Sequence, residues 1–169
     1  MGKLSITAVF FVSGIFWASC TGARLRLSDA APTKNIYTLK KKHMKPLVDF
    51  ACKQLTVPYK WGGGTPKGFD CSGLTSYCYK HFGVEIPRTA LAQSLCGKRI
   101  RSKRAKPGDL IFFQGPEKKD KQIGHVGIVV SGRKKAIKFI HAGSKGVAMS
   151  SLREEYFHQR FKIIRRIRK

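Results

Sequence analysis

Three residues in this sequence have side chains that could together carry out nucleophilic catalysis: Cys71, His125 and His141. Cys71 follows Asp70 at the expected start of a helix, where unpaired backbone N–H groups and the helix dipole stabilise a thiolate. Its neighbours are small or polar, and a glycine-rich stretch precedes them, which is a poor setting for a buried structural thiol. A cysteine nucleophile also needs a nearby base, and a histidine would provide one.

The two histidines are expected to lie side by side on a β-hairpin. His125 begins one apolar segment and His141 ends the next. If the turn is centred on Arg133, position 125 faces 141 and position 127 faces 139. Opposite side chains share a face and lie about 5 Å apart, and Gly127 would leave the adjacent space open. His125 is therefore the expected base for Cys71, with His141 orienting its ring.

A second chemistry uses the same three residues. One cysteine, two histidines and a water molecule could hold a catalytic zinc ion. The position of Cys71 at a helix start favours a nucleophile over a metal ligand, and we expect neither a metal nor a cofactor. No C-x-x-C pair typical of a zinc ribbon is present. Cys52 and Cys78, which have apolar neighbours at helical spacing, are interpreted as buried free thiols.

Helices are expected in the first half of the domain and strands in the second. Apolar residues at helical spacing predict one helix that starts at Pro46, includes Leu55 and stops before Pro58. Further helices are predicted over 71–82, capped by Asp70, and over 90–95. Strands are predicted over 110–113, 124–130, 136–141 and 161–167. Helices followed by an antiparallel meander are typical of an α+β domain.

The N-terminal segment has the form of an export signal. Lys3 precedes an uncharged apolar run over 4–17, which is shorter than the roughly 20 residues that a membrane-spanning helix needs. We expect residues 1–19 to be removed, residues 20–45 to form a basic tether, and residues 46–169 to form the catalytic domain. Ala18-Ser19-Cys20 resembles a bacterial lipoprotein cleavage site, so lipidation of Cys20 is an open alternative to simple cleavage.

The charge is strongly basic. The chain of 169 residues has 34 Lys and Arg against 9 Asp and Glu, a formal net charge of +25. Such a field favours polyanionic partners, which include nucleic acid, anionic membranes and anionic wall polymers. Basic residues crowd the end of the tether, over 40–42, and the end of the chain, over 165–169. An exported protein meets little nucleic acid, and no nucleic-acid recognition motif is found, so membrane or wall polymers are the expected partners.

Six motifs resemble the NlpC family of papain-fold cell-wall peptidases, in the order of that family. They are Pro58-Tyr59-Lys60-Trp61-Gly62-Gly63, Phe69-Asp70-Cys71-Ser72-Gly73-Leu74, Pro87-Arg88-Thr89 with Gln93, Pro107-Gly108-Asp109-Leu110, Gly124-His125-Val126-Gly127-Ile128 and Ile140-His141-Ala142. The resemblance covers about residues 46–168. It implies a papain-like α+β fold, with N-terminal helices packed on an antiparallel sheet and the catalytic cysteine at a helix N-terminus.

The same resemblance implies roles for individual residues. Cys71 would be the nucleophile, His125 the base and His141 the third polar residue. Tyr59 would help the Cys71 backbone N–H to stabilise the oxyanion. The remaining motif positions are Asp70 and Ser72, which would line the substrate cleft, Arg88, which is structural or holds a substrate carboxylate, and Gln93, which is structural.

The function implied is an exported, monomeric cysteine endopeptidase of the cell envelope that cleaves peptidoglycan stem peptides. The expected bond joins D-glutamate to diaminopimelate, and the peptide cross-link is the other choice. Two alternatives remain besides this reading. One is a zinc-dependent amidase or peptidase on the same Cys-His-His set, and the other is a wall-binding module without catalysis.

Overall fold

The computed structural model describes residues 40–116, 121–132 and 136–167, which belong to one compact unit. The predicted export signal, Cys20 and the tether as far as residue 39 lie outside the described residues. No helix within the described ranges is both long enough and apolar enough to cross a membrane.

The first helix begins before the residue expected to start it. A short 3-10 turn, η2 (Lys41–His43), leads into α1 (Met44–Cys52), so Pro46 lies in the first turn rather than at the start. A proline is tolerated there because the first-turn N–H groups have no partner within the helix. The buried face includes Met44, which lies within the segment expected to form the tether. Met44 thus contributes to the core of the domain.

The end of α1 also differs from the prediction. The helix stops at Cys52, and consecutive turns carry the chain to Thr56, which has a positive φ of 69°. Leu55 lies in these turns and is 36% exposed, so it does not extend the buried face. The helical period has therefore ended by Cys52, and the left-handed conformation at Thr56 turns the chain before it reaches Pro58.

The second and third helices lie where they were predicted. In α2 (Cys71–His81), the side chain of Asp70 caps the helix by accepting a hydrogen bond of 2.6 Å from the N–H of Gly73. Gly83, with φ of 74°, supplies the left-handed residue that ends the segment. The third helix, α3 (Ala90–Gln93), is shorter than predicted and is capped by the Thr89 hydroxyl.

A six-stranded antiparallel sheet forms the second layer, with the strand order β3-β8-β4-β5-β6-β7. Its strands are β3 (Lys98–Ile100), β4 (Leu110–Gln114), β5 (Ile123–Ser131), β6 (Lys138–Gly143), β7 (Gly146–Ser151) and β8 (Phe161–Arg166). The four predicted strands correspond to β4, β5, β6 and β8 and are confirmed. Five further strands and α-helices were not predicted: the edge strands β3 and β7, the strands β1 (Gly64–Thr65) and β2 (Gly68–Phe69) that pair as a small ribbon, and helix α4 (Glu155–Arg160).

The hairpin register differs from the predicted one by two residues. Ile128 pairs with Ile140 and Val129 with Phe139, with an irregularity between Val129 and Ser131. Continuing this register places position 127, rather than 125, opposite 141. The predicted pairing of His125 with His141 is therefore wrong, because the turn and the bulge determine the register and the apolar alternation does not specify them. A slip of two residues keeps every side chain on its predicted face.

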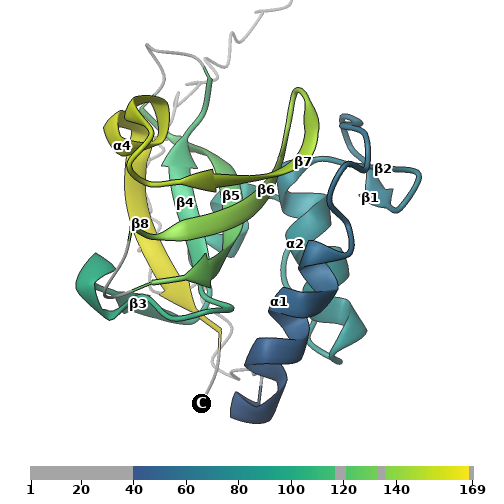
Figure 1. Cartoon of the computed structure of the whole chain (residues 1–169), viewed down its shortest axis with the longest axis horizontal. Helices are drawn as coiled ribbons and strands as arrows, with labels where there is room; N and C mark the ends of the chain where they lie inside the picture. The colour runs from purple at the N-terminus through teal and green to yellow at the C-terminus, as the bar shows by residue number, and fades with distance from the viewer. Residues whose placement is uncertain (1–39, 117–120, 133–135, 168–169) are drawn as a thin grey trace, which may run out of the picture. The chain divides into compact units, whose positions relative to one another are not determined.

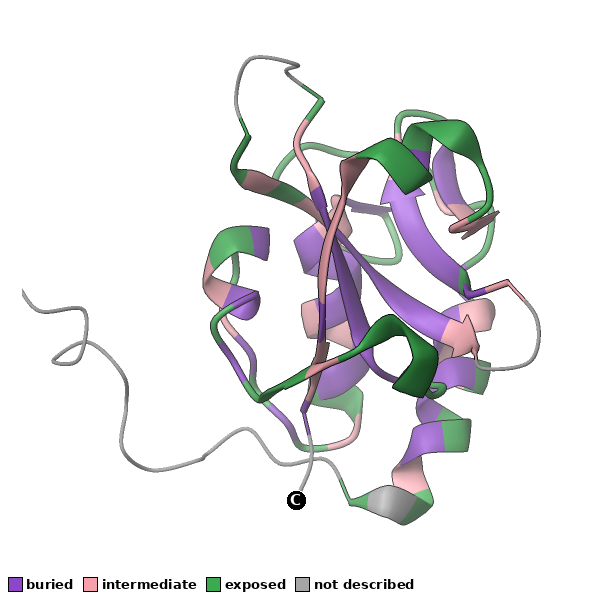
Figure 2. Cartoon of the chain, turned by 90° about the vertical axis from the view of Figure 1, so that its left-hand side faces the viewer, coloured by how far each residue is buried: buried purple, intermediate pink, exposed green. Residues whose placement is uncertain are grey.

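Helices α1 and α2 cover one face of the sheet (Figure 1), and α2 packs on β5 and β6. Buried residues concentrate on the strands and on the inner faces of the helices (Figure 2). A larger core joins α1 and α2 to the sheet. A second core on the other face gathers Ala105, Ile111, Phe113, Val129, Ile137, Phe139, Phe157 and Ile164.

The motif at 107–110 is structural. The carboxylate of Asp109 is fully buried and accepts bonds of 2.6 and 2.7 Å from the Arg166 guanidinium, together with the Lys106 N–H at 2.8 Å. Gly108 has a φ of 83°, and its carbonyl accepts the hydroxyl of buried Tyr79 at 2.5 Å. These bonds join the start of β4 to β8 and to α2, and so fix the sheet against the helix that begins at Cys71.

Candidate active site

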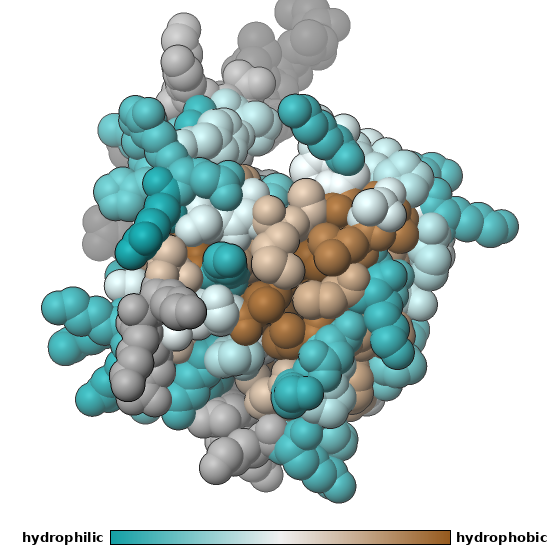
Figure 3. Space-filling model, in the orientation of Figure 1, coloured by the Kyte–Doolittle hydropathy of each residue, from teal (hydrophilic) through white to brown (hydrophobic). Residues whose placement is uncertain are grey.

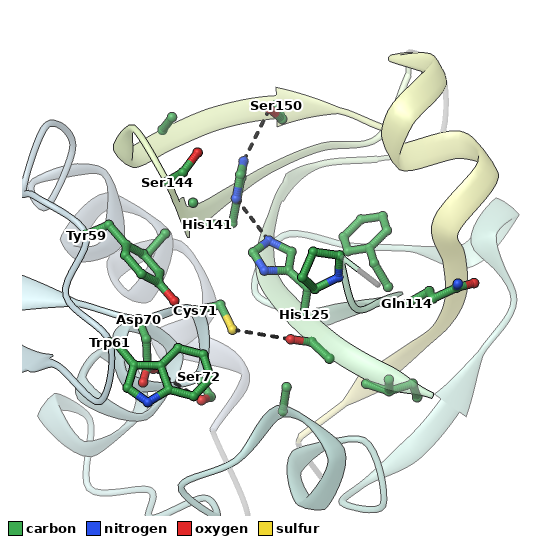
Figure 4. A pocket seen from close by; sticks show the side chains of 18 of the residues that line it. Tyr59, Trp61, Asp70, Cys71, Ser72, Gln114, His125, His141, Ser144 and Ser150 are labelled. Carbon is green, nitrogen blue, oxygen red and sulfur yellow. Dashed lines mark hydrogen bonds between the residues drawn. The ribbon is translucent and has the colours of Figure 1, made fainter. Parts of the chain in front are cut away.

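Cys71 is the first residue of α2 and faces a cleft of about 910 Å³ between the helices and the sheet. Its Sγ lies 3.9 Å from the carbonyl oxygen of Gly124, the residue that precedes His125 on β5 (Figure 4). The packing of α2 on β5 thus brings positions 71 and 125, which are far apart in the sequence, to opposite walls of one cleft. This is the placement that a nucleophile and its base require.

The thiol of Cys71 is not held as a thiolate in this cleft. Burial raises its pKa above the ordinary value, and the charge of Asp70 acts in the same direction. Backbone N–H groups of Val126 and Ser72 oppose this effect without reversing it. Desolvation thus acts against the thiolate that the helix start was expected to favour.

His125 and His141 form a hydrogen-bonded pair. Nε2 of His125 lies 3.0 Å from Nδ1 of His141, and the two rings are nearly perpendicular, with an interplanar angle of 82°. The predicted contact between the two rings is confirmed, although they meet diagonally across neighbouring strands. Figure 4 shows the other ring nitrogen of His125 turned toward the side of the cleft where Cys71 lies.

The region around Gly127 differs from the expected open space. A Cβ at this position would lie 2.8 Å from the Ile140 carbonyl oxygen and 2.9 Å from the Phe139 ring. It would also lie 3.3 Å from Cβ of His141. Gly127 therefore permits close packing of the hairpin beside His141 and does not provide room for substrate.

Aromatic side chains surround the histidine pair. Phe157 of α4 lies 5.1 Å from the His141 ring and 6.3 Å from the His125 ring, between centroids. Burial lowers the pKa of His125 to about 3, and the charge of His141 adds to this effect. Burial also lowers the pKa of His141 to about 4, against an opposing influence of Glu154. Both rings are neutral near pH 7, so a neutral base faces a neutral thiol.

The hydrogen bond between the two rings disfavours a shared metal ion. Two histidine ligands of one zinc ion would each direct a nitrogen at a common point about 2 Å away. Here Nε2 of His125 and Nδ1 of His141 are directed at each other over 3.0 Å. Among the described residues, no group of three His, Cys, Asp or Glu side chains has an arrangement that could hold a metal.

Asp70, Ser72 and Arg88 form a network on the helix side of the cleft, which all three line. The Arg88 guanidinium donates to both carboxylate oxygens of Asp70, at 2.9 and 2.6 Å, and to the Ser72 hydroxyl at 3.0 Å. Burial alone would raise the pKa of Asp70, but the bonds from Arg88 and from the Gly73 N–H lower it overall. Arg88 is thus paired within the protein, which favours its structural reading, while 46% of its side chain remains exposed.

Gln93 lies behind this network and is completely buried. Its amide donates to the carbonyl oxygens of Ser72 and Pro87 at 3.1 and 2.8 Å. Its carbonyl accepts the Thr75 hydroxyl at 2.8 Å. The predicted structural role is confirmed, because these bonds tie the first turn of α2 to the segment that carries Arg88.

Tyr59 lies on the same wall as Cys71, and its hydroxyl points toward Cys71 in Figure 4. Burial, followed by the charges of Cys71 and Asp70, raises the pKa of this phenol. The hydroxyl therefore keeps its proton and can donate it in a hydrogen bond. All the predicted site residues that the structure describes thus line one cleft.

Further cleft residues were not identified from the sequence. Ser150 of β7 lies 3.3 Å from Nε2 of His141, and Phe157 is the aromatic neighbour of both histidines. Trp61 is 88% exposed on the helix wall, and Tyr156 is 51% exposed on the wall formed by α4. Trp61 belongs to a motif already noted, but no sequence pattern distinguishes Ser150 or Phe157 from ordinary strand and helix residues.

A model of the NlpC/P60 family matches residues 56–166 of this chain. In the crystal structure of an NlpC/P60 family protein from Bacillus cereus ATCC 10987, the similar region covers 79% of this chain and 42% of that chain. The TM-score is 0.68 at 29% sequence identity. The predicted papain-like α+β fold, with helices packed on an antiparallel sheet, is confirmed.

Two curated proteins are similar over most of this domain. The chain is 39% identical over 124 residues to gamma-DL-glutamyl hydrolase of Bacillus subtilis (strain 168), which covers 72% of this chain and 29% of that protein. It is 35% identical over 113 residues to murein DD-endopeptidase MepS/murein LD-carboxypeptidase of Escherichia coli (strain K12), covering 66% of this chain and 56% of that protein. The similarity thus spans less than two thirds of the length of either relative.

Proposed function

Because the chain belongs to the NlpC/P60 family, we propose that it is a cysteine endopeptidase that hydrolyses the stem peptides of peptidoglycan. The observation that carries this proposal is the shared cleft, in which Cys71 at the start of α2 lies across from the hydrogen-bonded pair of His125 and His141. A wall-binding module without catalysis would have no need of a buried imidazole pair with lowered pKa values facing a thiol.

The proposed reaction starts from neutral groups. The Cys71 thiol gives its proton to Nδ1 of His125 while Sγ bonds to the carbonyl carbon of the scissile amide. The C–N bond then breaks, and the leaving amine takes the proton from His125. Water attacks the resulting thioester with His125 as base, which releases the new carboxylate and returns a proton to Sγ. His141 holds the ring of His125 in place throughout these steps.

Charge on the carbonyl oxygen develops near the start of α2. The backbone N–H of Cys71 lies in the first turn, where it has no carbonyl partner within the helix. We assign this N–H and the Tyr59 hydroxyl to the oxyanion. Asp70 and Ser72 are assigned to the binding of the substrate, with Asp70 as the group for a cationic amine.

The bond that we propose for cleavage joins D-glutamate to diaminopimelate. The name of the Bacillus subtilis relative, a gamma-DL-glutamyl hydrolase, supports this choice. The name of the Escherichia coli relative, a DD-endopeptidase, supports cleavage of the cross-link instead. Mass spectrometry of muropeptides after digestion of purified walls distinguishes the two, because the first cut leaves a new amino terminus on diaminopimelate and the second separates cross-linked dimers into monomers.

An alkylation and chelation experiment tests the cysteine mechanism against zinc. Iodoacetamide should abolish cleavage of a soluble muropeptide by modifying Cys71, whereas EDTA should leave the rate within twofold. The reverse pattern would contradict the proposal and support the metal-dependent alternative. Digestion that releases sugars without new peptide termini would contradict the proposed substrate bond.

We also propose that the enzyme acts as a monomer in the cell envelope after export, with anionic membrane or wall polymers as partners. Residues 1–19 would be removed, with lipidation of Cys20 as one outcome. The intact mass of the protein recovered from its native cells tests this point. A chain that retains Met1 in the cytoplasm would contradict it, and a mass increment on an N-terminal Cys20 would identify the lipid anchor.

The surface charge supports the proposed anionic partner. In Figure 3, hydrophilic side chains project around the edge of the face that is shown. Segment 98–106, which includes edge strand β3 and the 3-10 turn η3 (Ser102–Arg104), has six exposed cations and no acid. They are Lys98, Arg99, Arg101, Lys103, Arg104 and Lys106. We name this segment the basic edge and assign electrostatic attraction to it.

A further inference from the structure

Ser150 is a polar neighbour of the histidine pair, and it takes no part in the proposed reaction steps. Its Oγ lies 3.3 Å from Nε2 of His141, on the side of that ring away from His125. Three side chains on three adjacent strands thus form one chain of contacts, from His125 on β5 through His141 on β6 to Ser150 on β7 (Figure 4). We propose that Ser150 is a positioning residue that holds His141 in the tautomer that makes His125 a base.

The register places Ser150 where it can make this contact. Position 148 is directly opposite His141 on β7, and position 150 is opposite Phe139. Residues directly opposite share a face, and their diagonal neighbours on that face come within reach of long side chains. The imidazole of His141 spans this diagonal, so Ser150 supports its outer nitrogen while His125 contacts the inner one.

The proton positions follow from the proposed function, on which this inference rests. Nδ1 of His125 must be unprotonated to accept the proton of Cys71. A neutral His125 then carries its proton on Nε2 and donates it to Nδ1 of His141 across 3.0 Å. Nδ1 of His141 is therefore an acceptor, and a neutral His141 must carry its own proton on Nε2.

That last proton is the one that faces Ser150. His141 is only 7% exposed, so its Nε2–H is largely shielded from water and needs an acceptor. The Ser150 hydroxyl oxygen supplies this acceptor. In the opposite arrangement, Nδ1–H of His141 would donate to Nε2 of His125, and a neutral His125 would carry its proton on Nδ1. It could not then act as base toward the thiol.

Glu154 is the acidic group whose charge acts on the pKa of His141, and its contact with this ring differs from that of Ser150. It influences His141 through its charge, whereas its Oε1 accepts the Ser151 N–H at 2.6 Å. That hydrogen bond holds the carboxylate in the turn before α4. Ser150 therefore provides the hydrogen-bond contact at Nε2, and Glu154 provides only a longer-range charge.

The first test is a direct observation of the tautomers in the full chain labelled with 15N-histidine. Two-bond 1H–15N correlation spectra distinguish a ring protonated on Nε2 from one protonated on Nδ1. The wild-type protein should show both His125 and His141 with the proton on Nε2. A wild-type His141 protonated on Nδ1 would overturn the proposal, whatever the peptidase activity turns out to be.

The second test uses Ser150→Ala, Ser150→Thr and a control on the same strand, Ser151→Ala. Ser150→Ala should lower kcat about tenfold to a hundredfold, a part of what a general base contributes, with KM within twofold. It should also give a mixture of His141 tautomers. Ser150→Thr keeps the hydroxyl and should restore kcat to within threefold of wild type. Ser151→Ala removes a hydroxyl that accepts the Arg153 N–H and should leave kcat and the tautomers unchanged.

The outcomes separate this inference from the proposed function. A Ser150→Ala enzyme with wild-type kcat would overturn the positioning role and leave the peptidase assignment intact. A wild-type chain with no peptidase activity would overturn the proposed function, and the tautomer spectra would still decide the role of Ser150. Thermal unfolding curves of all three variants identify any loss of kcat that comes from misfolding. If a variant misfolds, the tautomer spectra of the wild-type protein decide the role of Ser150.

Discussion

Nε2 of His125 and Nδ1 of His141 lie 3.0 Å apart, although the two residues are not directly opposite each other in the hairpin. Their contact is diagonal, and close packing of the strands at Gly127 brings the rings together. Burial lowers the pKa values of both rings and keeps them neutral near pH 7. This pair is the part of the site on which the proposed mechanism depends most.

The orienting role of His141 predicts a selective loss of turnover. His141→Ala should lower kcat about a hundredfold, within the range that a positioned general base contributes, because the ring of His125 loses its partner. KM should change less than threefold, because orientation matters chiefly in the transition state. His141→Asn retains a side-chain acceptor and should recover part of the rate. Steady-state kinetics on a soluble muropeptide measure both effects, and equal losses of kcat in both variants would argue against an orienting role.

The lowered pKa values of the two histidines predict how stability depends on pH. In the unfolded chain these groups take up protons near their ordinary value of about 6.5, whereas in the folded protein they do so only at about 3 and about 4. The unfolded state therefore binds more protons between these limits. The stabilising contribution is fully present above about pH 6.5 and is lost as the pH falls toward 3. Urea denaturation at a series of pH values measures this effect.

The lowered pKa values of the two histidines also predict how kcat/KM behaves at acidic pH. His125 stays unprotonated well below pH 6, so kcat/KM should not fall with an apparent pKa near 6.5 while the protein remains folded. An acid limb centred near 6.5 in a folded enzyme would show that the histidine pair is more hydrated than the cleft geometry indicates. Circular dichroism at each pH distinguishes loss of structure from titration of His125.

The cap at Asp70 predicts a stability effect larger than that of a surface ion pair. Asp70→Ala removes the bond to the Gly73 N–H and the pairing of Arg88, and it should cost about 1–2 kcal/mol. The matched control is Asp49→Ala, which removes an exposed i,i+4 pair with Lys45 and should cost less than about 0.5 kcal/mol. Chemical denaturation of both variants tests the difference. Equal losses would show that Asp70 lines the cleft without stabilising α2.

The basic edge predicts salt-sensitive wall binding. Attraction between exposed charges is screened beyond about 8 Å at physiological salt. Binding of the protein to isolated walls should therefore weaken steeply as salt rises, while cleavage of a soluble muropeptide changes little. Replacing Lys98, Arg99 and Arg101 by Glu should weaken binding at low salt at least tenfold.

A control of equal charge makes this test specific. Replacing Lys45, Lys53 and Lys80 by Glu alters the same number of exposed cations on or beside α1 and α2. It should weaken wall binding less than the change at the basic edge. Equal losses would assign the attraction to net charge alone, and binding that is indifferent to salt would contradict an electrostatic partner.

The parts of the fold that were predicted correctly have a strong local signal. Helix α2 has a cap at Asp70 and a stop at Gly83, and β5 has an apolar alternation that survives a register shift of two. The hairpin register itself depends on the turn and on the irregularity near Ser131, which the alternation does not encode. Edge strands β3 and β7 were missed because charged or small residues there give no apolar alternation.

The sequence predicted which residues form the site, but it did not predict how burial shifts their pKa values. The motifs predicted that Cys71, His125 and His141 belong to one site, and all three residues line the same cleft. Burial raises the pKa of the Cys71 thiol, and the depth of that burial depends on the packing of the whole domain, which the local sequence does not encode. Ser150 and Phe157 were missed because their contacts with His141 exist only once β7 and α4 pack against β6.

The most direct test of the account is the activity of Cys71→Ala beside Cys52→Ala, both confirmed by mass and by circular dichroism. Cys52 is a half-buried free thiol outside the cleft and serves as the matched control. We expect Cys71→Ala to lower the rate of muropeptide cleavage at least about a thousandfold, as loss of a covalent nucleophile does, and Cys52→Ala to retain activity. A folded Cys71→Ala protein that still cleaves the peptide at a wild-type rate would contradict the assignment of Cys71 as nucleophile.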